Sequence, residues 1–362
     1  MALTSRTDQA TGGVGTVGIM GCGSIFERYV NGLRRFPEIE IVWCADLDEA
    51  LARRRAKELS IPSAGSASAA LSDGLGNASL VINLTPPSAH FEVSAALLSS
   101  GRHVYTEKPF ATTLDDGKAL IALAKARGLQ LGGAPDWFLG RSCRTARHAV
   151  ESGRIGEPIA ASGFITHSRV ERWHPNPGIF FAAGGGPVFD LGPYYVSALT
   201  DCLGPVSSVA ALERMPQTTR LVTSPDRVVH AVTVAVPTHA VSLLEFRSGV
   251  VASLTMSFDA WERTMPFIEI YGTEGTLSLP MPHESDKAVR CKLHDDEEFS
   301  ELELLGGEDY VRGLGVADMV RALGSGAEPR AGAARAYHVL EVLLAVDRAS
   351  AEHAFVAVES SF

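Results

Sequence analysis

The sequence predicts an α/β protein in two parts, a parallel sheet with helices followed by a mostly antiparallel sheet. Over residues 14–135 short apolar runs alternate with amphipathic stretches, a pattern typical of strand–helix–strand units in a parallel sheet. A glycine turn, Gly21-Cys22-Gly23, directly follows the first apolar run. Over residues 228–279 several β-rich runs follow one another with only short turns, which indicates antiparallel strands.

The first part contains five strand candidates separated by helix-like or polar stretches. These candidates are residues 16–20, 39–45, 79–85, 103–107 and 129–134. Residues 25–36 and 114–127 carry apolar side chains three or four positions apart, which predicts a helix in each range. Thr113 and Gly128 flank the second range and are residue types that begin and end helices.

The pattern of residues changes after residue 135, where we place a domain boundary. A helix candidate at residues 143–151 and a β-rich stretch lead into an irregular Trp-, Pro- and Gly-rich segment, residues 173–187. Further strand candidates are residues 230–236, 240–246, 250–258, 267–272 and 276–280, followed by an acidic hairpin or loop at 294–303. We therefore predict a flexible tail over 1–13, a first domain over 14–135 and a second over 136–362, with a closing helix at 333–351 that packs back on the body.

Composition excludes several classes of partner. The 362 residues are 46% hydrophobic and 20% charged, as in globular proteins, and the formal net charge is −10. This charge disfavours nucleic acid and anionic membranes, and no apolar run reaches the ~20 residues that a membrane span needs. The start of the chain lacks the pattern of a secretory signal. The five cysteines are odd in number and never form a CxxC pair, so we expect reduced thiols, a cytoplasmic location and no metal site.

The glycine turn is the first candidate binding site. Gly21 and Gly23 stand between a strand and a helix, where backbone N–H groups and the helix dipole can meet a pyrophosphate. The third small position of the motif is Phe26. Asp46 ends the second strand candidate about 20 residues further on, where a carboxylate can accept hydrogen bonds from a ribose 2′-hydroxyl. The alternative is that Asp46 caps a helix beginning near Asp48. The first reading predicts a Rossmann dinucleotide-binding domain that prefers NAD, with NADP as the second candidate.

Several longer motifs carry a resemblance to a known family. They are GCGSI (21–25), NLTPPSAH (83–90), GRHVYTEKPFA (101–111), ESGRIGEP (151–158), GGGPVFDLGPYY (184–195), YGTEGTLSLP (271–280) and AYHVLEVL (336–343). With them the chain resembles, over nearly its whole length, the glucose-fructose oxidoreductase and inositol dehydrogenase family, often called Gfo/Idh/MocA. The pair GRHVYTEKP and GGG..D.G is highly specific for this resemblance, whereas the glycine turn is not.

The resemblance implies a fold, a cofactor and a set of binding residues. It implies a Rossmann domain followed by an α/β domain with a large, mostly antiparallel open sheet for substrate binding and oligomerisation, and an active cleft between them. It further implies an NAD(P)-dependent oxidoreductase. The expected cofactor-binding residues are Gly21, Gly23, Ser24, Ile25, Asp46, Thr85, Pro86, His90, Glu107 and Lys108.

The expected catalytic residues are Lys108, Asp190 and Tyr194, with His174 as a further candidate. By resemblance, Lys108 reaches the substrate hydroxyl from a commonly cis Lys-Pro bond, and an ammonium there stabilises developing alkoxide charge; the alternative is a surface lysine in a proline turn. The family motif Asp-x-Gly-x-His places a histidine base where this chain has Tyr194. Asp190 and Tyr194 share a helix face if the segment is helical, which Pro193 allows only in a first turn.

A tyrosine is an unusual general base, because its hydroxyl ionises at about pH 10 in water. Relatives with tyrosine at this position typically use it as a proton donor to a carbonyl. The alternative is that Tyr194 only lines the cleft and that His174, a residue type that titrates near neutral pH, carries the proton. An equal alternative for His174 is a purely positional loop residue. Trp173 and Trp137 are candidates for packing on a sugar ring, although tryptophan is also common core filler; the predicted substrate-binding residues are Lys108, Trp173, His174, Asp190 and Tyr194.

Three functions compete at this point. The first is a dehydrogenase or reductase that moves a hydride between the nicotinamide and a carbon of a sugar, polyol or related cyclic alcohol. The second is a glycoside-processing enzyme in which retained NAD oxidises transiently with no net redox change. The third is a ligand sensor or regulator that keeps the fold without chemistry, against which the intact Lys108 counts. The β-rich runs carry apolar residues on both faces, so we also expect a homodimer or homotetramer joined through the second sheet.

Overall fold

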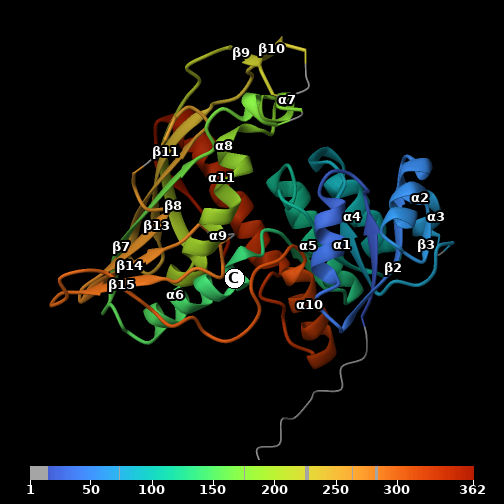
Figure 1. Cartoon of the computed structure of the whole chain (residues 1–362), viewed down its shortest axis with the longest axis horizontal. Helices are drawn as coiled ribbons and strands as arrows, with labels where there is room; N and C mark the ends of the chain where they lie inside the picture. The colour runs from blue at the N-terminus through green and yellow to red at the C-terminus, as the bar shows by residue number, and fades with distance from the viewer. Residues whose placement is uncertain (1–14, 73, 175, 225–227, 263, 282–283) are drawn as a thin grey trace, which may run out of the picture.

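The protein contains two β-sheets that lie side by side, with helices packed on both (Figure 1). The computed structural model describes residues 15–72, 74–174, 176–224, 228–262, 264–281 and 284–362. The predicted tail, residues 1–13, lies outside the described residues. One sheet has six parallel strands and the other has nine strands of mixed direction, which confirms the predicted fold class.

The six-stranded sheet has the order β3-β2-β1-β4-β5-β6. Its strands are β1 (Gly15–Met20), β2 (Ile39–Asp46), β3 (Ser63–Ser66), β4 (Leu80–Asn83), β5 (His103–Thr106) and β6 (Leu131–Gly133). All five predicted strands are present. β3 was not predicted, because its sequence Ser-Ala-Gly-Ser has no apolar run; its parallel pairing with β2 makes it a strand.

Helices cover this sheet between consecutive strands. They are α1 (Phe26–Leu33), α2 (Glu49–Glu58), α3 (Ala67–Leu71), the 3-10 turn η1 (Pro87–Ala89), α4 (His90–Ser99) and α5 (Leu114–Arg127). The ends of α5 follow the prediction. The Thr113 side chain accepts a hydrogen bond from the backbone N–H of Asp116, and Gly128 adopts the left-handed conformation that ends the helix.

The nine-stranded sheet has the order β16-β15-β14-β13-β7-β12-β11-β8-β17. Its strands are β7 (Pro158–Thr166), β8 (Val206–Arg214), β11 (His239–Phe246), β12 (Val251–Ser257), β13 (Ile268–Gly272), β14 (Gly275–Leu279), β15 (Arg290–Leu293), β16 (Ser300–Glu301) and β17 (Val356–Ala357). Neighbouring strands run antiparallel except β7 and β12, which are parallel. The predicted strand at 230–236 is only β10 (His230–Thr233), which pairs with β9 (Thr219–Val222) in a separate ribbon.

The helices of the second part lie against this sheet and beside the first part. They are the 3-10 turns η2 (Trp137–Leu139) and η3 (Val170–Arg172), and α6 (Arg141–Glu151), α7 (Gly178–Phe181), α8 (Gly186–Asp190), α9 (Gly192–Leu203), α10 (Leu314–Ser325) and α11 (Ala333–Glu352). The segment 173–187 was expected to be irregular throughout. It contains the short helix α7, whose Phe181 is fully buried.

The last two helices connect the two parts. α10 packs on α1 and β6, whereas α11 contacts α5 and β6 on one side and α9 and β8 on the other. The chain after residue 135 therefore supports the first sheet as well as the second.

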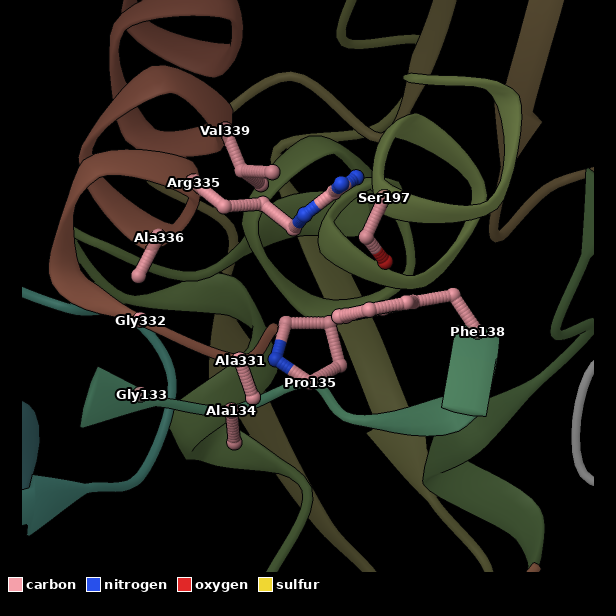
Figure 2. A pocket seen from close by; sticks show the side chains of 10 residues that line it. All are labelled: Gly133, Ala134, Pro135, Phe138, Ser197, Ala331, Gly332, Arg335, Ala336 and Val339. Atoms are coloured by element: carbon pink, nitrogen blue, oxygen red, sulfur yellow. The ribbon is translucent and has the colours of Figure 1, made fainter. Parts of the chain in front are cut away.

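A small pocket marks this junction. Figure 2 shows the residues that line it, among them Ala134 and Pro135, just after β6, Ser197 of α9 and Arg335 of α11. Arg335 also lies 3.4 Å from a carboxylate oxygen of Asp201, whose side chain is completely buried. None of the predicted catalytic residues Lys108, His174, Asp190 and Tyr194 lines this pocket, so we regard it as part of the structural junction.

Three further features bear on the predicted partners and location. Every helix within the described ranges is too short or too polar to cross a bilayer. All five cysteines are buried free thiols. Among the described residues, no group of three or more His, Cys, Asp or Glu side chains could hold a metal ion.

Candidate functional site

The glycine turn after β1 has room for a ligand on one side only. Gly21 has a φ of +100°, and a Cβ there would lie 2.7 Å from the carbonyl carbon of Leu84, so the turn needs glycine. Gly23 is exposed, and a Cβ there would meet no atom within 4 Å. Ser24 is exposed and Ile25 half-buried at the start of α1. The open side of the turn, at a helix N-terminus, therefore fits the pyrophosphate of a dinucleotide.

Asp46 lies against this turn. One of its carboxylate oxygens accepts a hydrogen bond from the backbone N–H of Cys22 at 2.7 Å, and the other accepts one from the N–H of Asp48 at 3.0 Å. The residue that caps α2 is Asp48, which accepts from the N–H of Leu51. Asp46 is therefore not the helix cap, and each of its oxygens retains a lone pair for a ribose hydroxyl.

The segment after β4 is held by buried polar side chains. The Thr85 hydroxyl donates to Asn83 at 2.6 Å, and Pro86 is exposed beside it. His90 is 1% exposed, and its two ring nitrogens lie 2.8 Å from the Thr85 carbonyl and 2.7 Å from the Pro109 carbonyl. Burial lowers the pKa of His90. His90, predicted to bind cofactor, thus connects the two loops and has no free ring nitrogen.

Glu107 is the centre of a buried hydrogen-bond network. One carboxylate oxygen accepts from the Tyr29 hydroxyl at 2.9 Å and from Arg312 at 3.2 Å. The other accepts from the backbone N–H of Lys108 at 2.8 Å. The Lys108–Pro109 bond is cis, as the resemblance implied. Glu107 was predicted to bind cofactor, and here its carboxylate orients the segment that carries Lys108.

Lys108 and Asp190 form an ion pair between the two parts of the protein. The Lys108 ammonium donates to Asp190 Oδ1 at 2.9 Å and to the backbone carbonyl of Asp190 at 3.0 Å. Burial would lower the pKa of Lys108, but the nearby Asp190 and Tyr194 outweigh it and raise that pKa. The lysine is therefore a permanent cation with a third N–H for a ligand.

Tyr194 lies beside this ion pair. Its ring centroid is 5.5 Å from the Lys108 ammonium and 3.8 Å from the ring of Trp137, on which it stacks. Its hydroxyl accepts a hydrogen bond from Arg312 at 3.1 Å. The expected single helix face is corrected: Asp190 ends α8 and Tyr194 is in the first turn of α9, because Pro193 occupies the helix start that proline tolerates.

Trp173 and His174 lie in a different group of side chains. The His174 ring contacts Trp173 and Phe180, and its Nδ1 accepts from the N–H of Asn176 at 3.0 Å. Trp173 is 46% exposed. No hydrogen bond or ring contact within the described residues joins either of them to Lys108, Asp190 or Tyr194. The structure therefore brings together three of the four predicted catalytic residues.

Comparison with family models decides the relationship. Residues 16–133 match the model described as "Oxidoreductase family, NAD-binding Rossmann fold", and residues 143–278 match the "GFO/IDH/MocA C-terminal domain". The chain belongs to the Gfo/Idh/MocA oxidoreductase family. This confirms the predicted family, the NAD-binding Rossmann domain and the assignment to oxidoreductases.

Individual relatives and a solved structure agree with the family. An uncharacterized oxidoreductase of Schizosaccharomyces pombe is 34% identical over 37% of this chain and 36% of its own. The dTDP-3,4-didehydro-2,6-dideoxy-alpha-D-glucose 3-reductase of Streptomyces antibioticus is 28% identical over 91% of this chain and 96% of its own. A levoglucosan dehydrogenase in complex with NADH and L-sorbose has a TM-score of 0.81 at 19% identity, covering 96% of this chain and 99% of that one. The match thus spans about a third of the first relative and nearly all of the second.

Two residues of the site of this Gfo/Idh/MocA protein, Arg312 and Tyr310, were not predicted from the sequence. Arg312 bridges Glu107 and Tyr194, and the ring of Tyr310 lies 5.7 Å from the ring of Trp137. Both residues belong to the loop before α10. The local sequence signal for this loop is the glycine that follows Arg312: Gly313 has a φ of +96°, a backbone conformation that favours glycine. A lone arginine in a loop carries no pattern that predicts a contact 205 residues away.

Proposed function

We propose that this protein is an NAD-dependent oxidoreductase that transfers a hydride between the nicotinamide and an alcohol or carbonyl carbon of a sugar, polyol or related cyclic alcohol. The observation that carries the proposal is the ion pair of Lys108 with Asp190, with the Tyr194 ring 5.5 Å from the ammonium. Bound NAD supplies the hydride acceptor or donor. The protein's residues must then bind the substrate oxygen and move its proton.

Lys108 is the group we assign to the substrate oxygen. Two of its N–H groups donate to Asp190, and its raised pKa keeps it cationic. A fixed cation beside the oxygen stabilises the negative charge that develops on it as its proton leaves in the oxidative direction, or as the carbonyl carbon gains a hydride in the reductive direction. Asp190 positions the ammonium. Because Asp190 belongs to the second part of the chain and Lys108 follows β5 in the first, the ion pair forms only when the two parts are packed together.

Tyr194 is the group we assign to the proton. It lies beside Lys108, whereas His174 shares no contact with that group. A proton carrier must come within hydrogen-bond reach of the reacting oxygen, so the residue beside the polarising cation is favoured.

A carbohydrate-like substrate is supported by the family comparison. The reductase of Streptomyces antibioticus is named for a deoxysugar nucleotide, and the levoglucosan dehydrogenase holds L-sorbose with NADH. Of the two tryptophans predicted to pack on a sugar ring, Trp137 stacks on Tyr194, whereas Trp173 is 46% exposed and contacts His174.

The proposal is tested by turnover with a panel of sugars and polyols in the presence of NAD. The expected result is NADH formation with at least one member of the panel, lost in Lys108→Ala and kept in Lys125→Ala, an exposed lysine on α5. Consumption of a glycoside without NADH formation would instead support the glycoside-processing alternative. Binding of NAD with no consumption of any panel member would count for a sensor.

We also propose that two copies associate through the outer face of the nine-stranded sheet. Four exposed apolar side chains lie on neighbouring strands of this sheet: Leu212, Val241, Leu243 and Val251. Val241 is opposite Leu212 in the register, and Leu243 lies two positions further along the same strand, whereas Val251 is opposite Glu245. Light scattering should give a dimer or tetramer, and Leu243→Lys should shift it toward monomer. A concentration-independent monomer of the unmodified protein would refute this.

A further inference from the structure

Arg312 connects the active-site tyrosine to a buried carboxylate. Its guanidinium donates one hydrogen bond to Glu107 at 3.2 Å and another to the hydroxyl oxygen of Tyr194 at 3.1 Å. The side chain of Arg312 is 16% exposed and that of Glu107 is 11% exposed. Tyr29 of α1 adds a second hydrogen bond to the same oxygen of Glu107 at 2.9 Å. The arginine is thus fixed at both ends of its planar fork.

The backbone of Arg312 is fixed as well. Its carbonyl oxygen packs on Gly32 of α1 so closely that a Cβ at Gly32 would lie 1.9 Å from it. The next residue, Gly313, has a φ of +96°, and a Cβ there would lie 2.8 Å from the Leu33 side chain. Two glycines therefore allow the loop before α10 to approach α1 and bring this arginine to the site.

We propose that Arg312 is a positioning residue that makes Tyr194 the proton donor and acceptor of the reaction. This inference rests on the proposed function. A guanidinium has no acceptor atom, so the Tyr194 oxygen must accept the hydrogen bond from Arg312. The hydroxyl proton is then directed away from Arg312 and is available to a substrate oxygen.

The charge of Arg312 supports the same role. In the reductive direction the Tyr194 O–H bond breaks and an O–H bond forms on the substrate oxygen, whose carbon receives the hydride from NADH; oxidation is the reverse. The phenolate left on Tyr194 accepts the hydrogen bond of Arg312 and faces the Lys108 cation, both of which stabilise it. Burial alone would lower the pKa of Arg312, but Glu107 and the neighbouring tyrosines raise it, so the guanidinium stays charged.

The titratable groups that interact with Tyr194 or with Arg312 include Lys108, Asp190, Tyr310 and Glu107. The buried Asp136 interacts in turn with Arg312 and Tyr310. Glu107 and Asp190 are each paired with a cation, so Arg312 and Lys108 are the charges that act directly on the tyrosine.

The test compares Arg312→Gln with the unmodified enzyme over a range of pH. In the oxidative direction, activity should rise with pH, and the midpoint of this rise should move up by about one pH unit or more in Arg312→Gln. The variant should also lose at least about tenfold in kcat at neutral pH, with the KM for NAD nearly unchanged. Arg312→Lys, which keeps a cation, should restore part of the shift. Arg321→Gln, at a 45%-exposed arginine on α10, is the matched control and should keep the profile of the unmodified enzyme.

A second readout does not depend on activity. Ultraviolet titration measures tyrosinate directly, and Tyr194→Phe identifies the part of the signal that belongs to Tyr194. That part should appear at higher pH in Arg312→Gln. Arg312→Gln alone leaves the buried carboxylate of Glu107 without its cation. A second comparison therefore removes that charge from both proteins: the double variant Glu107→Gln/Arg312→Gln is titrated beside Glu107→Gln. An unchanged tyrosinate signal in both comparisons would overturn the inference. A shifted signal without redox activity on any substrate would instead support the Arg312–Tyr194 link and contradict the proposed function.

Discussion

The ammonium of Lys108 donates a hydrogen bond to Asp190 Oδ1 at 2.9 Å and another to the carbonyl oxygen of the same residue at 3.0 Å. Lys108 follows β5 of the first sheet, and Asp190 ends α8 of the second part. One residue thus presents two acceptors to one cation across the junction. This leaves the third N–H of the ammonium free and fixes the direction in which it points.

Lys108→Ala should therefore lower turnover by two or more orders of magnitude. The reason is the loss of an electrostatic stabiliser of roughly 3–4 kcal/mol in the transition state. The affinity for NAD should change little, because we assign the pyrophosphate and ribose contacts to the glycine turn and Asp46. Steady-state kinetics with a cofactor titration measures both. A variant that kept most of its turnover would remove Lys108 from the mechanism.

Cofactor preference should depend on Asp46. Its carboxylate lies against the glycine turn, 2.7 Å from the Cys22 nitrogen, and a 2′-phosphate there would meet a negative charge. NAD(H) should bind more tightly than NADP(H), and Asp46→Ala should narrow the difference. Calorimetric titration with both cofactors measures this. Equal or tighter NADP(H) binding by the unmodified protein would contradict the assignment.

Tyr194→Phe should be more damaging than His174→Asn. Phenylalanine keeps the stacking on Trp137 and removes only the hydroxyl, while proton transfer typically contributes about 10²–10⁴-fold. His174→Asn should chiefly raise KM, because a loop histidine that binds a substrate hydroxyl acts on ground state and transition state alike. Comparing kcat and KM for the two variants separates the roles. If His174→Asn abolishes turnover and Tyr194→Phe does not, the two roles are exchanged.

Stability should fall as the pH rises through neutrality because of one carboxyl pair. Burial and the neighbouring Asp347 raise the pKa of Glu213 to about 7, and burial raises the pKa of Asp347 to about 6. A carboxyl whose pKa is higher in the folded state stabilises the fold at low pH and loses that contribution as pH rises through the folded value. Glu213→Gln should therefore raise the melting temperature at about pH 8 and change it little at about pH 5.

The control for this pair is Glu328→Gln, an exposed carboxylate before α11. It should change the melting temperature equally little at both pH values, because its charge is solvated in both states. If Glu213→Gln and the unmodified protein had the same melting temperature at about pH 8, the pKa of this carboxyl pair would not be raised in the folded state.

The sequence predicted those parts of the fold that carry a local pattern. The buried strand β4 reads as an apolar run, and α5 has a capping threonine and a terminal glycine. By contrast, β3 is Ser-Ala-Gly-Ser and becomes a strand only through its pairing with β2. This segment is a strand because it hydrogen-bonds to β2, and the four residues themselves carry no pattern that predicts a strand.

The candidate site likewise contains residues that the sequence predicts and residues that it does not. The resemblance carried by the EKP and Asp190–Tyr194 motifs predicted a shared site for Lys108, Asp190 and Tyr194, and these residues do lie together. The spacing alone predicted one helix face, whereas Asp190 and Tyr194 belong to two helices. The network behind them was not predictable, because Arg312 reaches Glu107 across 205 positions of chain. That contact depends on how closely the loop before α10 can approach Gly32, which is a property of tertiary packing.

The most direct test of the proposed hydride transfer is an isotope experiment. A sugar or polyol that the enzyme consumes is deuterated at the reacting carbon and incubated with NAD, and the deuterium content of the NADH is measured by mass spectrometry. We predict that the deuterium appears in the NADH formed by the unmodified enzyme, at a rate about 100-fold or more above that of Lys108→Ala. Product formation without deuterium in the cofactor would contradict direct hydride transfer at this site.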